Sequence, residues 1–435
     1  ITASSFVFTC LLIPPILKGR VIEIDLSALK SEWFRVSFIG DGVGLIFAMV
    51  FSLLGMVAVI YSIGYIRKHS HQSEYYFMIT LLVGSLMGVA FARNLLYLFI
   101  FWEIASLTTW RLVGFYGGKK VVSIANRTFL IIFAGSSFML LGFLMIYSDA
   151  HTFDLIALRN YSPSTMVLCF IFVGIITKAA IFPIHIWLPD AHTVAPSPVS
   201  ALLSGIVVKI GILAFLRIFI WTFHVSWDWI LVLAVFSSIV GASGALLETD
   251  IKKIIAYSTV SQTGYMLLGL AVLSEIGLAA GLVYFIVHAV AKAGLFLSAG
   301  IVEEKCGERE ISKLGGLMKV LPMTGTAFAL CSLTIIGMPP FGGFFSKVMV
   351  ISALVGEGHI VIAALAIFSA ILTLLYLIRL FSAVFLGDLK FGGIQEGSNI
   401  MTACVFFLGC VSLAVGLFIN QILHLINVTV MSVFQ

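Results

Sequence analysis

The sequence has little charge: Asp, Glu, Lys and Arg together make up 10% of its 435 residues, against roughly 25% in soluble domains. Hydrophobic residues make up 61%, and the mean hydropathy is +1.14. This composition excludes a soluble globular protein. The apolar residues form unbroken blocks of about 17 to 25 residues, the length at which a helix crosses a bilayer. A barrel of alternating apolar and polar strands is therefore excluded as well.

The sequence also lacks paired cysteines and runs of basic residues. Its six cysteines lie singly, without a CxxC pair to bind zinc or an iron–sulfur cluster, and we interpret them as packing residues. A net charge of +5 without a basic patch excludes nucleic acid as a partner. Because no cofactor motif is present, we expect no metal or cofactor in this chain and place any redox chemistry in another protein.

The apolar blocks predict an all-α, polytopic membrane helical bundle of about thirteen spans. The first block lacks the basic segment and cleavage site of a signal peptide, so it counts as a span. The expected spans are 2–17, 42–66, 76–92, 94–115, 128–147, 165–188, 199–221, 228–247, 254–273, 277–300, 322–355, 360–385 and 401–424. The block 322–355 is too long for one straight span and contains Pro339 and Pro340, which predict one broken helix.

Basic residues in the loops predict the orientation. The even-numbered loops hold 12 Lys and Arg residues and the odd-numbered loops hold 6, which places the even loops in the cytoplasm. The even-loop residues are Arg67, Lys68, Lys119, Lys120, Arg127, Lys252, Lys253, Lys305, Arg309, Lys313, Lys319 and Lys390, and the first loop holds Lys18, Arg20, Lys30 and Arg35. Thirteen spans put residue 1 inside and residue 435 outside. Because the sequence starts at Ile1, we expect a further segment before it.

Six ionisable residues lie far from the ends of the predicted spans. They are Glu103, Lys178, Lys209, His288, Lys292 and Lys347. Their Cα atoms lie about 15 Å from either end of a span, too deep for the side chains to reach the surface, and a charge at that depth is costly. We therefore expect each group to pair, to lose its charge or to contact water.

Prolines accompany two of these lysines. Pro183 removes a backbone hydrogen bond beside Lys178, and Pro339 and Pro340 precede Lys347. Broken backbone at membrane depth is found where protein or a water-filled cavity satisfies the freed groups, so a hydrated ion path is predicted beside each lysine.

The remaining ionisable residues suggest how a proton moves. A lysine whose distance to Glu103 changes can bind and release a proton, so a movable ion pair can act as a valve. His288 and Lys292 are four residues apart, share a helix face and can pass a proton between them. Each assignment has a plainer alternative: a static ion pair for Glu103 and the lysines, and a packing histidine for His288.

Four further residues lie near the ends of predicted spans. His185 and His192 flank Pro189, where an interfacial role is as reasonable as a functional one. Arg217 and Arg379 are expected to extend their guanidinium groups to the membrane surface.

Five segments carry a family resemblance. They are FWEIASLTTW (101–110), ITKAAIFPIHIWLPDAHTVAPSPVSALLSGIVVKIGI (176–212), DIKKIIAYSTVSQTGYMLLGL (250–270), HAVAKAGLFLSAG (288–300) and MPPFGGFFSK (338–347). In this order they resemble the antiporter-like membrane subunits shared by respiratory complex I, membrane-bound hydrogenases and multi-subunit sodium/proton antiporters. The resemblance covers nearly the whole chain from about residue 40 and includes motifs that are specific in combination.

The resemblance implies a fourteen-helix fold with two inverted five-helix repeats, each containing a broken helix. The breaks at Pro183 and Pro339 match this pattern, and our count of spans is one short, as expected if a first helix precedes Ile1. It divides the chain into N-terminal membrane helices (1–93), a first repeat with one half-channel (94–221), a second repeat with another (228–355) and C-terminal membrane helices (356–435).

The resemblance also implies a role for each buried ionisable residue. Glu103 matches the glutamate that pairs with the lysine of the first broken helix, Lys178. Lys209 matches the connecting lysine, Lys347 the terminal lysine, and His288 and Lys292 match central-axis positions. Where some members carry a second histidine one turn before His288, this chain has Tyr284. A relay through that turn needs tyrosine or water instead.

The implied function is proton translocation by one subunit of a redox-driven complex, complex I-like or hydrogenase-like, in the cell (inner or cytoplasmic) membrane. Its expected partners are other antiporter-like and small membrane subunits, peripheral redox subunits and the lipid bilayer. Iron–sulfur clusters, flavin, a nickel–iron centre or quinone would belong to those partner subunits.

Two alternatives stay open. The first is that the chain belongs to a multi-subunit sodium/proton secondary antiporter. Sodium prefers oxygen ligands, whereas the spans offer one central carboxylate and several lysines, so protons are favoured. The second is a scaffold that holds neighbouring subunits and retains its charges without using them.

Overall fold

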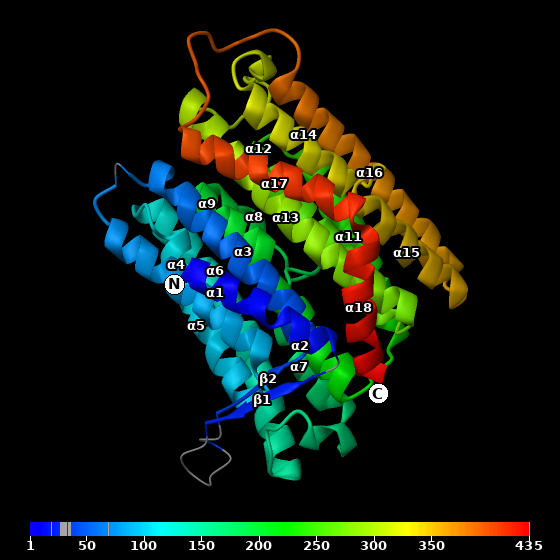
Figure 1. The fold of residues 1–435 in the computed structure, drawn as a ribbon. Coiled ribbons are helices and arrows are strands. Elements are labelled where there is room, and N and C mark those ends of the chain that lie inside the picture. Colours follow the sequence, from blue (N-terminus) through cyan, green and yellow to red (C-terminus); the bar gives the residue numbers. More distant parts are fainter. Residues whose placement is uncertain (19, 27–32, 34–35, 68, 435) are drawn as a thin grey trace.

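The computed structural model describes residues 1–18, 20–26, 33, 36–67 and 69–434. Lys30, Arg35 and Lys68, which entered the orientation count, lie outside these residues. The described chain is a bundle of long helices with one two-stranded hairpin near its N-terminus (Figure 1).

The elements follow one another in a simple order. The helices are α1 (Thr2–Leu11), α2 (Ile13–Leu17), α3 (Gly42–Tyr65), α4 (Gln72–Phe91), α5 (Leu95–Val113), α6 (Lys119–Ala150), α7 (Thr165–Lys178), α8 (Trp187–Val194), α9 (Ser197–Leu202), α10 (Lys209–Ala214), α11 (Asp228–Leu247), α12 (Ile251–Ala271), α13 (Glu275–Cys306), α14 (Pro322–Ile336), α15 (Gly342–Gly356), α16 (Ile360–Phe385), α17 (Asn399–Leu417) and α18 (Ile419–Phe434). The strands are β1 (Ile22–Asp25) and β2 (Ser37–Gly40), paired antiparallel. Single turns of 3-10 helix are η2 (Ala157–Asn160) and η5 (Leu317–Lys319), and π-helical segments are η3 (Leu203–Val207) and η4 (Phe215–Thr222).

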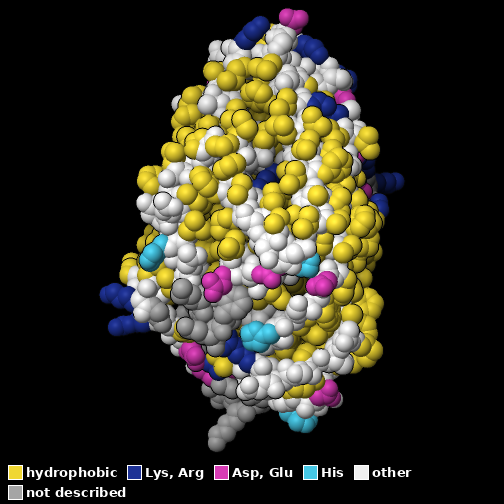
Figure 2. All heavy atoms as spheres, turned by 90° about the vertical axis from the view of Figure 1, so that its right-hand side faces the viewer, with side chains coloured by type: hydrophobic (Ala, Val, Ile, Leu, Met, Phe, Trp, Pro, Cys, Tyr) yellow, Lys and Arg dark blue, Asp and Glu magenta, His cyan; other side chains and the backbone are white. Residues whose placement is uncertain are grey.

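The helices have the dimensions of a multi-pass membrane protein. Among the described residues, nine helices are long and apolar enough to cross a bilayer. Figure 2 shows hydrophobic side chains over most of one flank, with charged side chains gathered mainly toward the ends. The helix α12 is not one of the nine although it has 21 residues. It carries a run of Ser, Thr and Gln, yet nearly all of its residues are buried.

Both predicted helix breaks are present. α7 ends at Lys178, and α8 begins at Trp187 after an irregular stretch that contains Pro183. α14 ends at Ile336, and α15 begins at Gly342. The second break opens with Gly337 at φ 87°, a left-handed conformation that glycine adopts without strain.

Other predicted elements were wrong in detail. The span 401–424 is two helices, because α17 ends at Leu417 and α18 begins at Ile419. The span 2–17 is also divided, at Leu12, just before two prolines. The hairpin β1–β2 was not predicted, since strands of four residues give no clear alternation. The span 199–221 is present as Ser197–Thr222, and it includes the wider turns of η3 and η4.

The centre of the bundle is the helix α13, which packs against α9, α12, α14, α15 and α17 (Figure 1). Nearly every residue from Gly277 to Val302 is buried. Helices such as α6 and α16 instead expose one face along their length. A helix buried on all sides can hold polar groups only where neighbouring helices provide partners, which sets the conditions for the site.

Candidate functional site

The six ionisable residues predicted from the sequence lie inside the bundle. Lys178, Lys209, His288 and Lys292 have no exposed surface, Lys347 is 5% exposed, and Glu103 is partly buried. Among the described residues, none of the four lysines forms an ion pair. Each ammonium group is instead bound by neutral oxygens.

Lys178 is the last residue of α7 and reaches the helix α5. Its Nζ donates to Ser106 Oγ at 2.8 Å and lies 5.6 Å from the centre of the Trp102 ring. Glu103 lies on the same helix, one turn before Ser106, and its Oε1 has no hydrogen-bond partner within the described chain. The direct ion pair expected between Glu103 and Lys178 is not formed among the described residues, and Lys178 instead contacts a serine of the helix that carries Glu103.

The first helix break is stabilised by side chains of neighbouring elements. The Trp187 indole Nε1 donates to the Thr177 carbonyl at 2.9 Å. The Phe182 amide donates to Ser237 Oγ at 3.1 Å. Side chains of the protein thus provide hydrogen bonds for some of the backbone groups that the break leaves without helical partners. A helix break at membrane depth requires such partners.

Lys209 begins α10, between the two π-helical segments η3 and η4. Its Nζ donates to the carbonyl of Ser204. The Ser204 hydroxyl lies 2.7 Å from Thr259 Oγ1 of α12. This serine therefore connects Lys209 to the polar helix α12.

Lys292 and His288 share one face of α13, as predicted, but they do not bond to each other. Lys292 Nζ donates to the Ile255 carbonyl at 3.0 Å and lies 2.5 Å from Ser258 Oγ, both on α12. Neither ring nitrogen of His288 has a hydrogen-bond partner among the described residues. A buried imidazole without partners is energetically unfavourable, so the site favours a polar occupant such as water beside His288.

Lys347 lies on α15, after the second break, and reaches back to α14. Its Nζ donates to the carbonyls of Ile335 at 2.8 Å and Ile336 at 3.2 Å, the last two residues of α14. It also lies 5.4 Å from the centre of the Tyr265 ring. The ammonium group therefore caps the negative end of the first half of the broken helix.

Sequence reasoning missed the polar face of α12. Its buried members are Ser258, Thr259, Ser261, Gln262 and Thr263, none of which has exposed surface. The signal was present as the run STVSQT inside an apolar block. These residues provide the partners of Lys292 and of Ser204, so α12 is as much part of the site as the helices with lysines.

Two predictions about arginines need correction. Arg217 does not reach the surface: it is 1% exposed and binds both carboxylate oxygens of Asp41, with Nη2 to Oδ1 at 2.6 Å. Asp41 also accepts from the Gly44 amide at 2.8 Å and so caps α3. Arg379 is partly buried and donates to the Leu246 carbonyl at 2.6 Å, at the end of α11. Both guanidinium groups therefore bind partners inside the bundle and do not extend to the membrane surface.

The two histidines near Pro189 are also buried inside the bundle. His192 has no exposed surface and stacks on Phe296, with ring centres 4.3 Å apart, and neither nitrogen has a partner in the part of the chain that the structure describes. His185 is 8% exposed and lies near Tyr257, at 6.3 Å between ring centres. His185 lies in the turn between α7 and α8, and His192 lies on α8, so both segments place their rings inside the bundle.

A polar cleft opens on the side of the even-numbered loops, near α8, α12 and the end of α13. Lys252 Nζ lies 2.6 Å from Glu303 Oε2, and Arg309 Nε lies 3.2 Å from Asp250 Oδ2. Lys252 is 2% exposed, so this ion pair reaches from the cleft into the protein. In the described part of the chain, no three His, Cys, Asp or Glu side chains come together as metal ligands.

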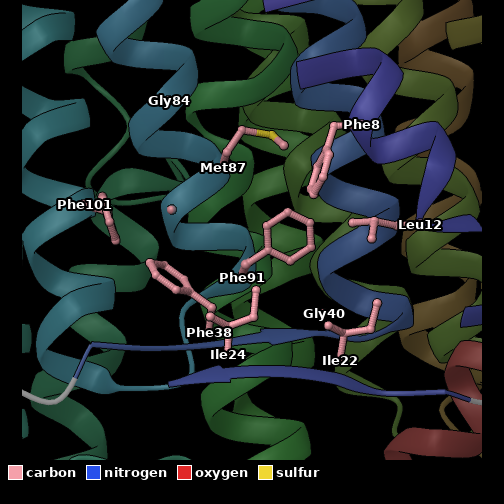
Figure 3. A pocket seen from close by; sticks show the side chains of 11 residues that line it. Phe8, Leu12, Ile22, Ile24, Phe38, Gly40, Gly84, Met87, Phe91 and Phe101 are labelled. Atoms are coloured by element: carbon pink, nitrogen blue, oxygen red, sulfur yellow. The ribbon is translucent and has the colours of Figure 1, made fainter. Parts of the chain in front are cut away.

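A second cavity, of about 370 Å³, lies away from these residues, between α1, α4, α5 and the hairpin (Figure 3). Its walls are apolar side chains such as Phe8, Phe38, Phe91 and Phe101, together with two glycines of α4. None of the described residues that line it is ionisable, so these walls offer no path for a proton.

The fold defines the class: a multi-pass membrane protein with two broken helices and four buried lysines held by neutral oxygens. Residues 92–373 match the family model described as "NADH:quinone oxidoreductase/Mrp antiporter, TM". The chain belongs to this family, whose members include antiporter-like subunits of Mrp complexes and of complex I. The resemblance inferred from the motifs is confirmed.

Relatives come from both branches of the family. The chain is 33% identical over 410 residues to a Na(+)/H(+) antiporter subunit of Alkalihalophilus pseudofirmus, an alignment that covers 86% of this chain and 51% of the relative. It is 30% identical over 403 residues to NADH-quinone oxidoreductase subunit M of Rickettsia typhi, covering 90% of this chain and 81% of the relative. The chain thus spans about half the length of that antiporter relative.

Solved structures share the whole fold. A chain of the Mrp complex from Dietzia sp. matches with a TM-score of 0.93 and 25% identity, covering 100% of this chain and 91% of that chain. Respiratory complex I from Thermus thermophilus matches with a TM-score of 0.89 and 23% identity, covering 99% and 94%. The second likeness shows the fold alone. These proteins are subunits of multi-subunit membrane complexes.

Proposed function

We propose that this chain is the proton-translocating subunit of a multi-subunit complex in the cell membrane. The buried lysines Lys178, Lys209, Lys292 and Lys347 would carry the proton, with Glu103 and His288 assisting. The observation that supports this most is that, within the described chain, all four ammonium groups are bound by neutral oxygens and by no carboxylate.

The physical reason is that the group in contact with a buried lysine determines how easily the lysine releases its proton. A carboxylate in contact would hold a buried lysine in its charged form, whereas a hydroxyl or carbonyl oxygen lets the amine exchange its proton at lower cost. Glu103 lies on α5 one turn from Ser106, so movement of Glu103 toward Lys178 would exchange the serine for the carboxylate. Approach of Glu103 would load Lys178, and its withdrawal would release the proton toward Lys209.

The driving force is assigned to partner subunits. We propose a redox-driven complex, complex I-like or hydrogenase-like, whose clusters, flavin, nickel–iron centre or quinone lie in other chains. The second candidate is a sodium/proton secondary antiporter. It is supported by the 33% identity to the Alkalihalophilus pseudofirmus antiporter relative and by the structural likeness to an Mrp complex.

The test is proton flux in membrane vesicles that contain the native complex, followed with a pH-sensitive dye. Lys209→Met keeps the approximate length of the side chain but removes the amine that binds the proton. This variant should reduce proton flux at least about tenfold. Lys120→Met, on an exposed residue, is the matched control. Unchanged flux in Lys209→Met, with the complex assembled, would overturn the proposal and favour a scaffold.

Sodium separates the two candidates. Flux driven by a redox substrate and unaffected by removal of sodium supports the redox-driven complex. Proton flux that depends on an imposed sodium gradient and does not change when redox substrates are added supports the antiporter instead.

A further inference from the structure

Three hydroxyl side chains lie within one turn of α5, and one of them has no hydrogen-bond partner. Ser106 Oγ donates to the Trp102 carbonyl at 3.0 Å, and Thr108 Oγ1 donates to the Ile104 carbonyl at 2.8 Å, which is the usual bond of a hydroxyl inside a helix. Thr109 is as buried as Thr108, with 2% exposed, yet its Oγ1 has no partner in the part of the chain that the structure describes. This buried hydroxyl therefore indicates a site for a polar occupant such as water.

The site lies on the face of α5 that is directed at Lys178. Trp102, Ser106 and Thr109 are spaced by four and three residues, so they share one face of the helix. Lys178 Nζ contacts the first two of them, because it donates to Ser106 Oγ at 2.8 Å and lies 5.6 Å from the centre of the Trp102 ring. Thr109 follows Ser106 on this face by about 4.5 Å along the helix axis. A water molecule bound to Thr109 is therefore next to the contact between Ser106 and Lys178.

The residues on the two sides of this contact differ in what they offer a proton. Thr109 lies toward the even-numbered loops, and its hydroxyl both donates and accepts hydrogen bonds. Trp102 lies toward the odd-numbered loops, and its indole N–H only donates. Ser106 uses its one hydrogen for the Trp102 carbonyl, so it holds the ammonium group without supplying a proton. Because a proton moves along hydrogen bonds only through groups that both accept and donate, this face of α5 favours access to Lys178 from the side of Thr109.

The even-numbered loops are close to Thr109. α5 ends at Val113, four residues after Thr109 and about 6 Å further along the helix axis. The polar cleft on this side of the protein begins beyond that end: Tyr116, three residues after α5, and Asp190 of α8 line it. α8 also packs against α5. Thr109 thus lies about one helical turn from the end of α5 that faces the cleft.

We propose that Thr109 binds the water molecule through which protons from the side of the even-numbered loops reach Lys178. An excess proton arrives on this water and makes it a hydronium ion. One O–H bond of the hydronium breaks, an N–H bond forms on the neutral amine of Lys178, and water remains at Thr109. The threonine itself is not changed, so it is a positioning residue. This inference rests on the proposed function, because it names the group that orients the proton supply of Lys178.

The first test is proton flux through the complete complex in membrane vesicles. Thr109→Val keeps the shape of the side chain and removes the hydroxyl, so flux should fall about tenfold. Thr109→Ser keeps the hydroxyl and should restore most of the flux. Thr108→Val is the matched control, because the neighbouring hydroxyl is equally buried and is already bonded within its own helix. Its flux should stay within about twofold of the wild type.

The second test separates proton supply from packing by varying the acidity on each side of the vesicle membrane. Without the bound water, supply of protons to Lys178 limits transport. The ratio of wild-type flux to Thr109→Val flux should therefore shrink as the buffer facing the even-numbered loops is made more acidic, and acid on the other side should not change it. Charged groups around this approach are common to both proteins and cancel in the ratio: Lys178 of α7, Glu103 and Arg111 of α5, Glu74 of α4, Asp190 of α8 and Arg127 of α6.

Three results would overturn the role of Thr109 in an assembled complex. They are flux in Thr109→Val within about twofold of the wild type, an equal loss of flux in Thr109→Ser, and a loss that acid on the side of the even-numbered loops does not reduce. Lys178→Ala distinguishes this inference from the proposed function. Full flux in Lys178→Ala would reject the proposed function itself, whereas loss of flux in Lys178→Ala with full flux in Thr109→Val would reject the role of Thr109 alone.

Discussion

The two broken helices place their lysines in unlike surroundings. Lys178 ends α7 and is held by the Ser106 side chain of another helix, one turn from Glu103. Lys347 follows its break and is held by the carbonyls of Ile335 and Ile336, which belong to its own broken helix. Both ammonium groups lie over an aromatic ring, at 5.6 Å and 5.4 Å from its centre.

The difference concerns what can move. A serine hydroxyl rotates, and an approaching carboxylate can replace it, so the surroundings of Lys178 can change while the backbone stays in place. Backbone carbonyls at a helix end are fixed, and no acidic residue forms an ion pair with Lys347 in the described chain. We infer that Lys178 is the regulated lysine and Lys347 the one with a constant environment.

The largest expected effect comes from Lys178→Arg. Arginine keeps the positive charge but does not release its proton, so flux should fall about a hundredfold or more if Lys178 carries the proton. Lys120→Arg on the surface is the control for the exchange itself. Dye-based flux in vesicles measures both, and normal flux in Lys178→Arg would show that Lys178 serves only as a fixed charge.

Glu103→Gln tests whether the surroundings of Lys178 are regulated, and we expect a smaller loss of flux than in Lys178→Arg. The amide keeps the shape of the side chain and removes the charge that would replace Ser106, so flux should fall about tenfold. Glu304→Gln, on an exposed residue of α13, should leave flux unchanged. Equal flux in Glu103→Gln and the wild type would remove the main distinction between the two breaks.

Lys347→Met should affect stability where Lys178→Met does not. The first variant leaves two buried carbonyls without a donor, at a cost of about 1–3 kcal/mol. The second leaves one serine hydroxyl, which can find another acceptor, and also removes a buried charge. Thermal unfolding of the purified complex should therefore shift downward in Lys347→Met and much less in Lys178→Met. Equal shifts in the unfolding temperature would mean that the carbonyl contacts of Lys347 contribute no more to stability than the serine contact of Lys178.

The smallest effect on proton flux is expected from a substitution of Glu308, in the loop after α13. The amides of Arg309 and Glu310 and the Lys313 ammonium bind the Glu308 carboxylate, which lowers the pKa of Glu308 to about 2. The folded pKa lies below the unfolded one, so this contribution to stability is complete above about pH 5 and is lost as the pH falls toward the folded value. Glu308→Gln should therefore leave the pH profile of proton flux unchanged near neutrality. A changed profile would place a titrating control group in this loop.

Much of the fold could be predicted because membrane spans and proline breaks are local signals. Pro183 and Pro339 located both breaks, and the charge-poor blocks located most helices. The hairpin and the division between α17 and α18 escaped prediction. The hairpin strands pair across a loop, and the start of α18 at Ile419 carries no proline or charge.

The candidate site was predicted residue by residue, but its contacts were not. Depth in a span identifies a buried lysine, yet its partner depends on how helices pack, so Ser106 and Ser258 could not be chosen from the sequence. Arg217 shows the same limit, because its partner Asp41 lies 176 residues away in the chain. Long-range pairs of this kind are fixed by packing and leave no local pattern.

The most direct test of the account measures proton flux in Lys178→Ala and Lys347→Ala side by side, in vesicles with the assembled complex and with Lys120→Ala as control. If the two unlike breaks are halves of one path, either variant alone should abolish steady flux and the control should retain it. Flux near the wild-type level in either lysine variant would contradict a single path through both broken helices.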